Sequence, residues 1–406
     1  MLGAVQAGLL SANSQGAPIP AAERIFAVFD PYKKGTNLTL SNEYLTMTSA
    51  GTVWKSGLCN LGKALAEGGK WYWETTVTTI YTQEYWMSGL ANIEANLASY
   101  LGANTESLGC RYRAGFGWQA YYNASATTDN GYSDGAPANG DIIMHELDLD
   151  NDTYRQGRNG VWGSVYLSAK QLPSVLMSND SGAFDRIFPA HAFYSTAAVT
   201  ANFGQSPFTY EPPEGCNPGW YWEPVIAHRS LFNAADGTSL AAYTPDLGTA
   251  LTQYGSGAWT INNNELGCAG YPNNPALTVD TGNPDAVIVA NIKLDTSNNG
   301  PGVAFRLVDA SNFLNVTVNA STTSCTVRKL VAGTATAVAS ASGLSITSGQ
   351  VVLLKVVVVG SLLEVYLDDV LIITTTVSDF PTATKHGIGD STYPNACRWL
   401  DLEVYA

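Results

Sequence analysis

Charged side chains are scarce in this 406-residue chain. Asp, Glu, Lys and Arg make up 13% of it, and only 20 residues are Lys or Arg against 34 that are Asp or Glu. The basic residues form no tract, so nothing in the sequence supports binding to a nucleic-acid backbone. An anionic membrane surface is excluded as a partner on the same ground, and no run of about 18 apolar residues predicts a membrane-spanning helix.

Metal-binding and catalytic patterns are also missing. No two of the six cysteines form a C-x-x-C pair, so a zinc site is not predicted. The four histidines are isolated in sequence and have no Ser or Cys in a nucleophile-elbow context. We therefore predict no cofactor, no metal and no catalytic residue. The cysteines are either buried free thiols or form one or two disulfides in an extracellular particle. These residues are Cys59, Cys110, Cys216, Cys268, Cys325, Cys397, His145, His191, His228 and His386.

Glycine, serine, threonine and asparagine are abundant, which favours an all-β protein with many turns. The length predicts two domains. The net charge of −14 divides evenly between two parts of the chain. Twelve basic and 19 acidic residues up to Trp220 give −7, and 8 basic and 15 acidic residues after it give −7.

The first 24 residues predict a docking arm. Leu2, Val5 and Leu9 follow a helical spacing, and Gly16 to Pro20 interrupt it. The segment lacks the basic start of a signal peptide and is too short to hold a core. We expect Leu2, Val5, Leu9 and Leu10 to pack against another protein chain, in a homo-oligomer or a larger particle.

Residues 25–215 predict the first domain. In the strand Gly69–Val77 the side chains alternate, so Trp71 and Trp73 share one face and should both enter the core. Asn151-Asp152 and Asn159-Gly160 predict hairpin turns, because Asn and Gly accept positive φ at little cost.

Several segments of this domain, in this order and at these spacings, resemble a SPRY domain. They are Gly69–Val77, Gly89–Asn92, Gly140–Ile143, Leu147–Asp150, Asn159-Gly160, Ile187–Ala190 and Val199–Gly204. The resemblance implies a bent β-sandwich that binds partners through its loops and is not an enzyme. One position departs from the family: Gln156 stands where an aromatic residue is usual, so we expect that hairpin to pack loosely or to contact another subunit.

Proline and glycine in 211–219 predict a domain boundary, with a linker at 216–223 and a second domain at 224–406. The second domain resembles a concanavalin A-like or laminin G-like jelly roll, through Val351–Val359, Gly360, Leu362–Asp368 and Val370–Ile373. The predicted fold class is therefore all-β, with two tandem antiparallel sandwiches behind a short arm. Its clearest strands are Ala286–Leu294, Val303–Val308, Phe313–Val318, Val351–Val359, Leu362–Leu367, Val370–Thr375 and Trp399–Tyr405.

The best binding candidate is the segment 115–125 with 132–135, which mixes Tyr, Trp, Asn, Ser and Gly. Recognition surfaces favour this composition, because rigid aromatic side chains supply contact area at low entropy cost. Among the candidate ligand-binding residues, Trp118 has the most core-like pattern, and Tyr121, Tyr122 and Tyr132 are expected to be the most exposed. The alternative is that these aromatics only close the sandwich.

Glu146, Asp148 and Asp150 lie at alternate positions and would share one face of a strand. A retaining glycosidase needs two carboxylates about 5–5.5 Å apart, so a glycoside hydrolase is one alternative. The other is structural, because SPRY domains carry a Leu-Asp-Leu-Asp strand at this place. We expect these three side chains to bond to turns or to solvent.

A SPRY-like domain joined to a laminin G-like domain, behind a docking arm, resembles surface proteins of tailed bacteriophages. This resemblance implies a non-enzymatic virion surface protein, as capsid decoration or a head or tail fibre, held by residues 1–24 to other virion subunits and to copies of itself. Its domains would adhere to host-surface glycans. A bacterial surface carbohydrate-binding protein is the second hypothesis, and the glycoside hydrolase is the third.

Overall fold

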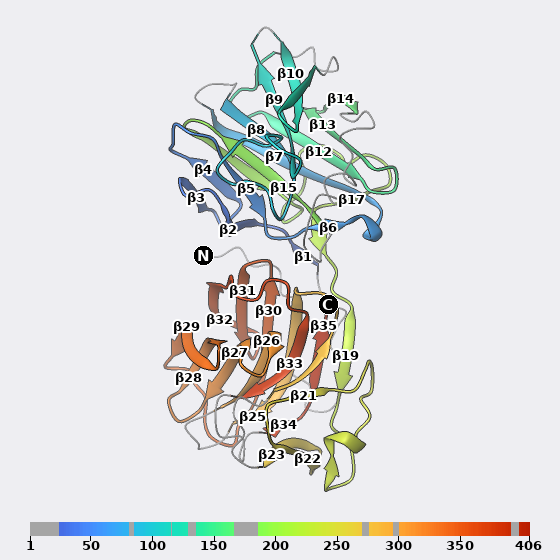
Figure 1. Ribbon diagram of the computed structural model, residues 1–406, viewed down its shortest axis with the longest axis vertical. Coiled ribbons are helices and arrows are strands. Elements are labelled where there is room, and N and C mark those ends of the chain that lie inside the picture. Colours follow the sequence, from blue (N-terminus) through green and yellow to red (C-terminus); the bar gives the residue numbers. More distant parts are fainter. Residues whose placement is uncertain are drawn as a thin grey trace. The chain divides into compact units, whose positions relative to one another are not determined.

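The structure is a computed structural model, and it describes residues 24–80, 85–114, 116–128, 135–165, 186–269, 276–294, 300–390 and 398–406. The predicted arm residues Leu2, Val5, Leu9 and Leu10, and the candidate Tyr132, lie outside these ranges. The described chain forms two compact units, which divide between Trp222 and Glu223 (Figure 1). Both are built from β-sheets, which confirms the predicted all-β class with two tandem domains of antiparallel strands.

The first unit contains two eight-stranded sheets and one two-stranded sheet. One large sheet, called sheet B here, consists in spatial order of β11 (Ser125–Thr128), β10 (Gly117–Tyr122), β9 (Ser107–Arg113), β8 (Trp86–Asn92), β15 (Arg186–Phe193), β5 (Lys55–Cys59) and β2 (Phe29–Lys34), with β6 (Lys63–Ala64) beside β15. The other, sheet C, consists of β14 (Val161–Val165), β13 (Thr153–Arg158), β12 (Ile142–Asp148), β7 (Lys70–Ile80), β16 (Ala197–Asn202), β4 (Thr46–Ser49) and β3 (Leu38–Ser41), with β17 (Cys216–Pro218) beside β7.

The predicted linker 216–223 is wrong for all but its last residue. Strand β17 runs parallel to β7, with Cys216 opposite Lys70. Strand β18 (Tyr221–Trp222) pairs with β1 (Ile25–Phe26) to form the two-stranded sheet. Prolines and glycines do not prevent this pairing, because a two- or three-residue edge strand needs few backbone donors. The first unit therefore extends to Trp222.

The core of the first unit confirms the predicted orientation of the two tryptophans on β7. Trp71 and Trp73 are 8% and 1% exposed. The Trp220 ring packs edge-on against both. Tyr72 and Glu74, on the other face of β7, are buried as well. Glu74 accepts hydrogen bonds from the Tyr72 hydroxyl and from the backbone N–H of Thr209 and Tyr210, so both faces of this strand are covered.

A polar network crosses the core of the first unit. Gln156 on β13 donates to the Ser88 hydroxyl on β8, 2.9 Å away, and so links sheet C to sheet B. It also donates to the Tyr154 hydroxyl, which lies 2.8 Å from His145 Nδ1. His191 from β15 lies edge-on to His145. Gln156 is 1% exposed, so the expectation of a loosely packed hairpin at this position is wrong: polar partners replace the aromatic residue.

The second unit contains a ten-stranded and a seven-stranded sheet. Sheet D consists of β20 (Thr238–Ser239), β22 (Ala258–Asn262), β23 (Glu265–Ala269), β34 (Arg398–Trp399), β25 (Ala286–Lys293), β30 (Val351–Val359), β31 (Leu362–Leu367) and β32 (Val370–Thr376), with β35 (Leu402–Tyr405) beside β25 and β19 (Ile226–Ser230) beside β35. Sheet E consists of β21 (Thr252–Tyr254), β24 (Ala276–Asp280), β33 (Lys385–Asp390), β26 (Pro301–Asp309), β27 (Asn312–Asn319), β28 (Ser324–Val331) and β29 (Thr334–Ser342). Within the described residues there are also two short 3-10 turns, η1 (Leu65–Glu67) in the first unit and η3 (Leu240–Ala242) in the second.

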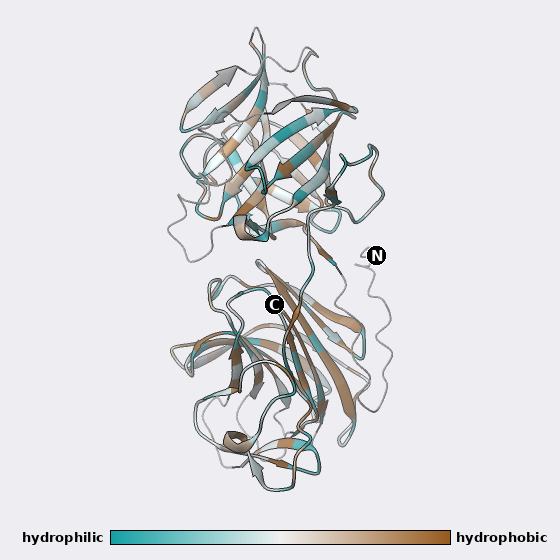
Figure 2. Cartoon of the chain, turned by 90° about the vertical axis from the view of Figure 1, so that its right-hand side faces the viewer, coloured by the Kyte–Doolittle hydropathy of each residue, from teal (hydrophilic) through white to brown (hydrophobic). Residues whose placement is uncertain are grey.

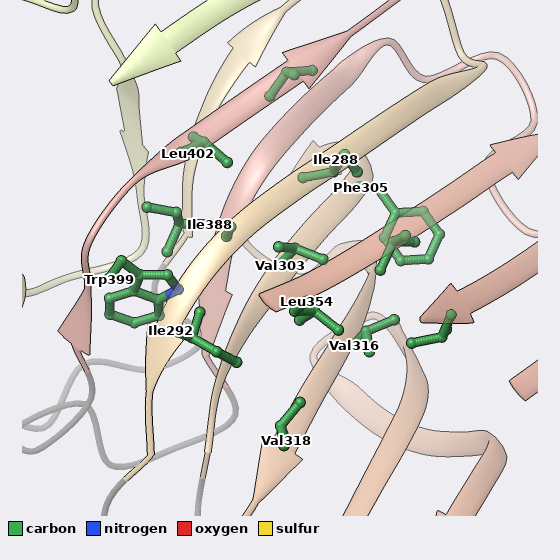
Figure 3. Close-up of a cluster of buried hydrophobic side chains, with 14 of the residues drawn as sticks. Ile288, Ile292, Val303, Phe305, Val316, Val318, Leu354, Ile388, Trp399 and Leu402 are labelled. Atoms are coloured by element: carbon green, nitrogen blue, oxygen red, sulfur yellow. The ribbon is translucent and has the colours of Figure 1, made fainter. Parts of the chain in front are cut away.

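The core of the second unit is aliphatic. Ile288, Val303, Val316 and Leu354 come from strands of both sheets and are 0% exposed. Figure 3 shows their side chains gathered in one cluster. Trp399 closes one end of this cluster and donates its indole N–H to the Gly302 carbonyl. The strands of this unit carry long brown stretches in Figure 2. Apolar residues on alternate positions of long strands build this core, and the predicted strands are confirmed to within two or three residues, except that the last one is split in two.

The predicted turns are confirmed by their backbone angles. Asp152, Asn159 and Gly160 have positive φ in the hairpins of sheet C. Asp368 and Asp369, between β31 and β32, have φ of 48° and 64°, which a two-residue hairpin of the I′ type requires. Among the residues that the structure describes, no helix has the length and apolar character needed to cross a membrane.

Candidate ligand-binding site

The candidate residue Tyr121 lies on β10, on the face of sheet B that points away from the core. Alternation fixes the two faces: Cys110 and Trp118 point inward and are 0% and 1% exposed. Arg111 and Tyr121 therefore point outward, and so does Gln119, which is opposite Arg111 in the register of β9 and β10. Trp118 is buried, as its pattern indicated. Tyr121 is only 6% exposed, so the expectation of high exposure is wrong for it, while Tyr122 is half-buried.

Tyr121 is covered because a loop folds over this face. The loop between β8 and β9 is anchored by Ser56, whose N–H donates to the Leu97 carbonyl and whose hydroxyl donates to the Ser99 carbonyl. Gly109 permits the close approach, since a Cβ there would lie 2.5 Å from Leu101 Cβ. The loop thereby brings Tyr100 against Tyr121, with ring centroids 6.2 Å apart.

Four further contacts extend this pair into a continuous aromatic cluster. Trp54, just before β5, contacts Tyr100 and Tyr194, with centroids 5.8 and 5.7 Å away. Tyr194 follows β15 and contacts Tyr85, which precedes β8, at 4.8 Å. The backbone N–H of Tyr194 donates to the Tyr85 carbonyl. We call Tyr85, Tyr194, Trp54, Tyr100, Tyr121 and Arg111 the aromatic–arginine cluster.

Arg111 supplies the charge of this cluster. Its guanidinium carbon lies 4.5 Å from the Tyr121 ring centroid and 5.7 Å from that of Trp54, within the range of a cation–π contact. Its Nη2 donates to the Tyr121 hydroxyl at 2.9 Å, and that hydroxyl donates to Gln119 Oε1 at 2.8 Å. Arg111 Nε is buried and has no hydrogen-bond partner among the described residues.

The rings of the cluster combine support with access. Tyr85 is 37% exposed, and Trp54, Tyr100 and Tyr194 are half-buried. Each ring is therefore held by a neighbour while part of its surface faces solvent. Rigid aromatic faces beside a few fixed polar groups are the usual composition of a binding site for a small or extended ligand.

Sequence reasoning found only one member of this cluster. The other five come from separate segments, which strand register and the β8–β9 loop bring together. One signal in the sequence was available: β9 alternates Leu108, Cys110 and Tyr112 with Gly109, Arg111 and Arg113, which predicts two arginines side by side on a solvent-facing strand.

The three carboxylates of the glycosidase alternative have structural partners instead. Glu146 forms an ion pair with Arg155 across the β12–β13 hairpin, at 2.5 Å. Asp148 accepts from the backbone and side chain of Asn151 and pairs with Lys70. Although burial opposes it, the combined effect of these bonds lowers the pKa of Asp148 below its usual value.

Asp150 lies in the turn after β12 and not on the strand, and it accepts from the Gly69 N–H. The three acids therefore do not line one strand face, and each has a bond to a hairpin partner, to a turn or to a neighbouring strand. In the part of the chain that the structure describes, no group of three or more His, Cys, Asp and Glu residues is placed to hold a metal ion.

These observations define a class: an all-β protein of two sandwich units with a surface aromatic–arginine cluster on the first. No protein-family profile and no curated protein matches the chain. Solved structures do. The SPRY domain of human HERC1 is 18% identical with a TM-score of 0.34, over 44% of this chain and 99% of that one. The carbohydrate-binding module CBM66 from Bacillus subtilis is 20% identical with a TM-score of 0.31, over 39% and 96%. A further human SPRY domain is 15% identical with a TM-score of 0.30, over 43% and 98%.

Proposed function

We propose that this protein is a non-enzymatic recognition protein of a bacteriophage particle. The segment 1–24 attaches it to other virion subunits or to copies of itself, and the two sandwich units stand on the particle surface. The first unit binds saccharides of the host envelope through the aromatic–arginine cluster. That cluster is the observation on which the proposed recognition role depends.

The chemistry of the cluster fits a saccharide. Sugar rings present C–H faces that pack against aromatic rings, and hydroxyl groups that bond to fixed polar side chains. Tyr85, Tyr194 and Trp54 supply partly exposed rings, and Gln119 and Arg111 supply polar groups held in place by the Tyr121 hydroxyl. The position of the cluster on paired strands and a pinned loop makes it rigid before a ligand arrives, which lowers the entropy lost on binding.

Binding of the purified protein to host cells and to extracted envelope polysaccharide tests the recognition role. Trp54→Ala removes the ring that contacts both Tyr100 and Tyr194, so we expect binding to fall at least tenfold. Tyr32→Ala is the matched control, since Tyr32 is 49% exposed and has no ring contact with the cluster. Equal binding by the wild type and Trp54→Ala would contradict the proposed site.

The virion role needs a separate experiment. We expect mass spectrometry of purified particles to detect this chain. A variant lacking residues 1–20 should fold and remain soluble but fail to enter particles. Normal incorporation of the truncated protein would refute the arm as the anchor. Absence of the full-length chain from particles, with glycan binding retained, would favour the second candidate, a bacterial surface carbohydrate-binding protein.

A further inference from the structure

The two arginines of β9 differ from most others in the described ranges, because no carboxylate described by the structure accompanies them. Five arginines lie within 4 Å of an acidic side chain: Arg155, Arg158, Arg186, Arg229 and Arg306. Within the described ranges, Arg111 and Arg113 form no ion pair. Arg113 instead lies 5.0 Å from the ring centroid of Phe116, which is 57% exposed.

This lack of partners is notable in a chain with 34 acidic residues and a net charge of −14. A guanidinium that is partly desolvated between two rings keeps its charge, and hydrogen-bonding capacity that the protein leaves unused is available to a ligand. Among the described residues the Tyr121 hydroxyl is the one hydrogen-bond acceptor of the Arg111 guanidinium, so its remaining Nη N–H groups are left for a ligand, whereas the buried Nε is not. The Tyr121 hydroxyl holds one Nη in place and so orients the guanidinium.

We propose that the aromatic–arginine cluster selects saccharides that carry a carboxylate, such as polymers rich in uronic acids. The carboxylate pairs with Arg111, and Arg113 adds positive charge two residues along the same face of β9. The sugar rings pack on Trp54, Tyr194 and Tyr85. This inference rests on the proposed saccharide-binding function and adds the charge of the ligand to it.

The geometry of the arginine side chain favours a carboxylate as the charged group of the ligand. Its planar fork can donate two parallel hydrogen bonds to the two oxygens of a carboxylate. Arg111 and Arg113 lie at alternate positions of one strand, so they share a face and form a short positive strip. A row of rings beside a positive strip fits a repeating chain of sugars with acidic groups.

A peptide fits this surface less well. Peptides that bind sheets often add a strand to an open edge and use its backbone groups. The strands beneath the cluster, β10, β9, β8, β15 and β5, each have a paired strand on both sides. Recognition here depends on side chains alone, as is usual for sugars.

The test uses the full-length protein and four polymers: polygalacturonate, alginate, carboxyl-reduced polygalacturonate and dextran sulfate. Affinity is measured by calorimetry at low and at physiological salt, since screening should weaken the charge contact. We expect polygalacturonate or alginate to bind at least tenfold more tightly than the reduced polymer and than dextran sulfate. Arg111→Gln should remove this preference while leaving weak binding to the reduced polymer.

Three further variants separate charge from ring contact. Arg113→Gln should reduce the preference by a smaller factor, and it alters an exposed hairpin, so folding is not at risk. Trp54→Ala should weaken binding to all saccharides. Lys293→Gln, which removes one positive charge from the second unit, should change nothing. Circular dichroism and tryptophan fluorescence verify that each variant is folded.

The outcomes are distinguishable. Equal affinity for native and carboxyl-reduced polygalacturonate would overturn the carboxylate inference and leave the proposed saccharide-binding function standing. Tighter binding to dextran sulfate than to either carboxylated polymer would overturn it as well. If none of the four polymers and no host polysaccharide binds, both the inference and the proposed function fail.

Discussion

The two units build their cores from different chemistry. In the first, Gln156, Ser88, His145 and Tyr154 form a hydrogen-bonded network between the sheets. In the second, the space between the sheets is filled mainly by Val, Ile and Leu. A polar core depends on a set of bonds that must all be made, whereas an aliphatic core depends on volume and burial. The first unit should therefore respond to changes in protonation and hydrogen bonding, and the second to changes in packing.

Acid should give the largest difference between the units. His145 and His191 are both 1% exposed, and burial lowers the pKa of His191 to about 3 and that of His145 well below its usual value. Each histidine is neutral in the folded state and charged in the unfolded state between pH 6.5 and its folded pKa. Folding stability is therefore fully present above pH 6.5 and falls with pH by about 1.4 kcal/mol per unit for each group.

The second unit has an opposing contribution. Burial lowers the pKa of His228 and His386 to about 4, and hydrogen bonds lower the pKa of Asp280 and Asp309. Burial raises the pKa of three other carboxyls, those of Glu364, Asp369 and Asp401. A carboxyl with a raised pKa binds its proton more tightly in the folded state, so protonation in acid stabilises the fold.

We therefore expect the first unit to unfold at a higher pH than the second. Eight of the ten tryptophans precede Glu223, so a fluorescence titration follows the first unit while circular dichroism follows both. Coincident acid transitions by the two methods would contradict the difference between the units.

Trp73→Ala should have the next largest effect. Trp73 is 1% exposed, stacks on His145 and contacts Trp220, so its truncation should destabilise the first unit by about 3–5 kcal/mol. Trp399→Ala is the matched change in the second unit, where the indole is 0% exposed. Calorimetry should show each variant lowering a different transition. If both variants lower the same transition, the two units do not unfold separately.

Gln156→Leu tests the network between the sheets. It removes the bonds to Ser88 and Tyr154 and leaves buried groups without partners, which should destabilise the first unit by about 1–3 kcal/mol. The same substitution at the exposed Gln253 in the second unit should stay within about 0.5 kcal/mol. Urea denaturation measures both, and an unchanged midpoint for Gln156→Leu would show that the network contributes little.

Glu146→Gln should have the smallest effect on stability. Its ion pair with Arg155 is partly exposed on the arginine side, so the loss should be about 1 kcal/mol. Glu265→Gln, in the exposed pair with Lys293, is the control and should change less. An assay for reducing sugar released from host polysaccharide accompanies this variant. Release by the wild type that Glu146→Gln abolishes would favour the glycoside hydrolase alternative over a binding protein.

The sequence pattern within short segments predicted most of the fold, because successive residues of a β-strand point to opposite faces of its sheet. Ala286–Lys293 and Val351–Val359, both among the predicted strands, pair with each other from Ala286 opposite Val358 to Lys293 opposite Val351. The turn at Asn159-Gly160 was predicted from residues that accept positive φ, and both have it. Short strands without such a pattern were missed, and β17, which contains Cys216 and Pro218, is the clearest example.

The candidate site was harder to predict because it depends on contacts between distant segments. Trp54, Tyr100 and Tyr194 meet only when the ends of neighbouring strands and one loop are aligned. Alternation sends Trp118 into the core and Tyr121 to the opposite face, and the burial of Trp118 was indicated by its pattern. The low exposure of Tyr121 could not be deduced from the sequence, because a loop that begins about thirty residues earlier in the chain covers it.

The cysteines bear on where such a protein can be made and where it can work. The five within the described residues form no disulfide with one another. Burial raises the pKa of Cys59 far above its usual value, that of Cys325 to about 12 and that of Cys216 to about 11. Thiols held protonated react slowly with oxidants and disulfides, because the thiolate is the reactive form. No disulfide among these five residues therefore has to form or break when the surrounding medium changes from reducing to oxidising.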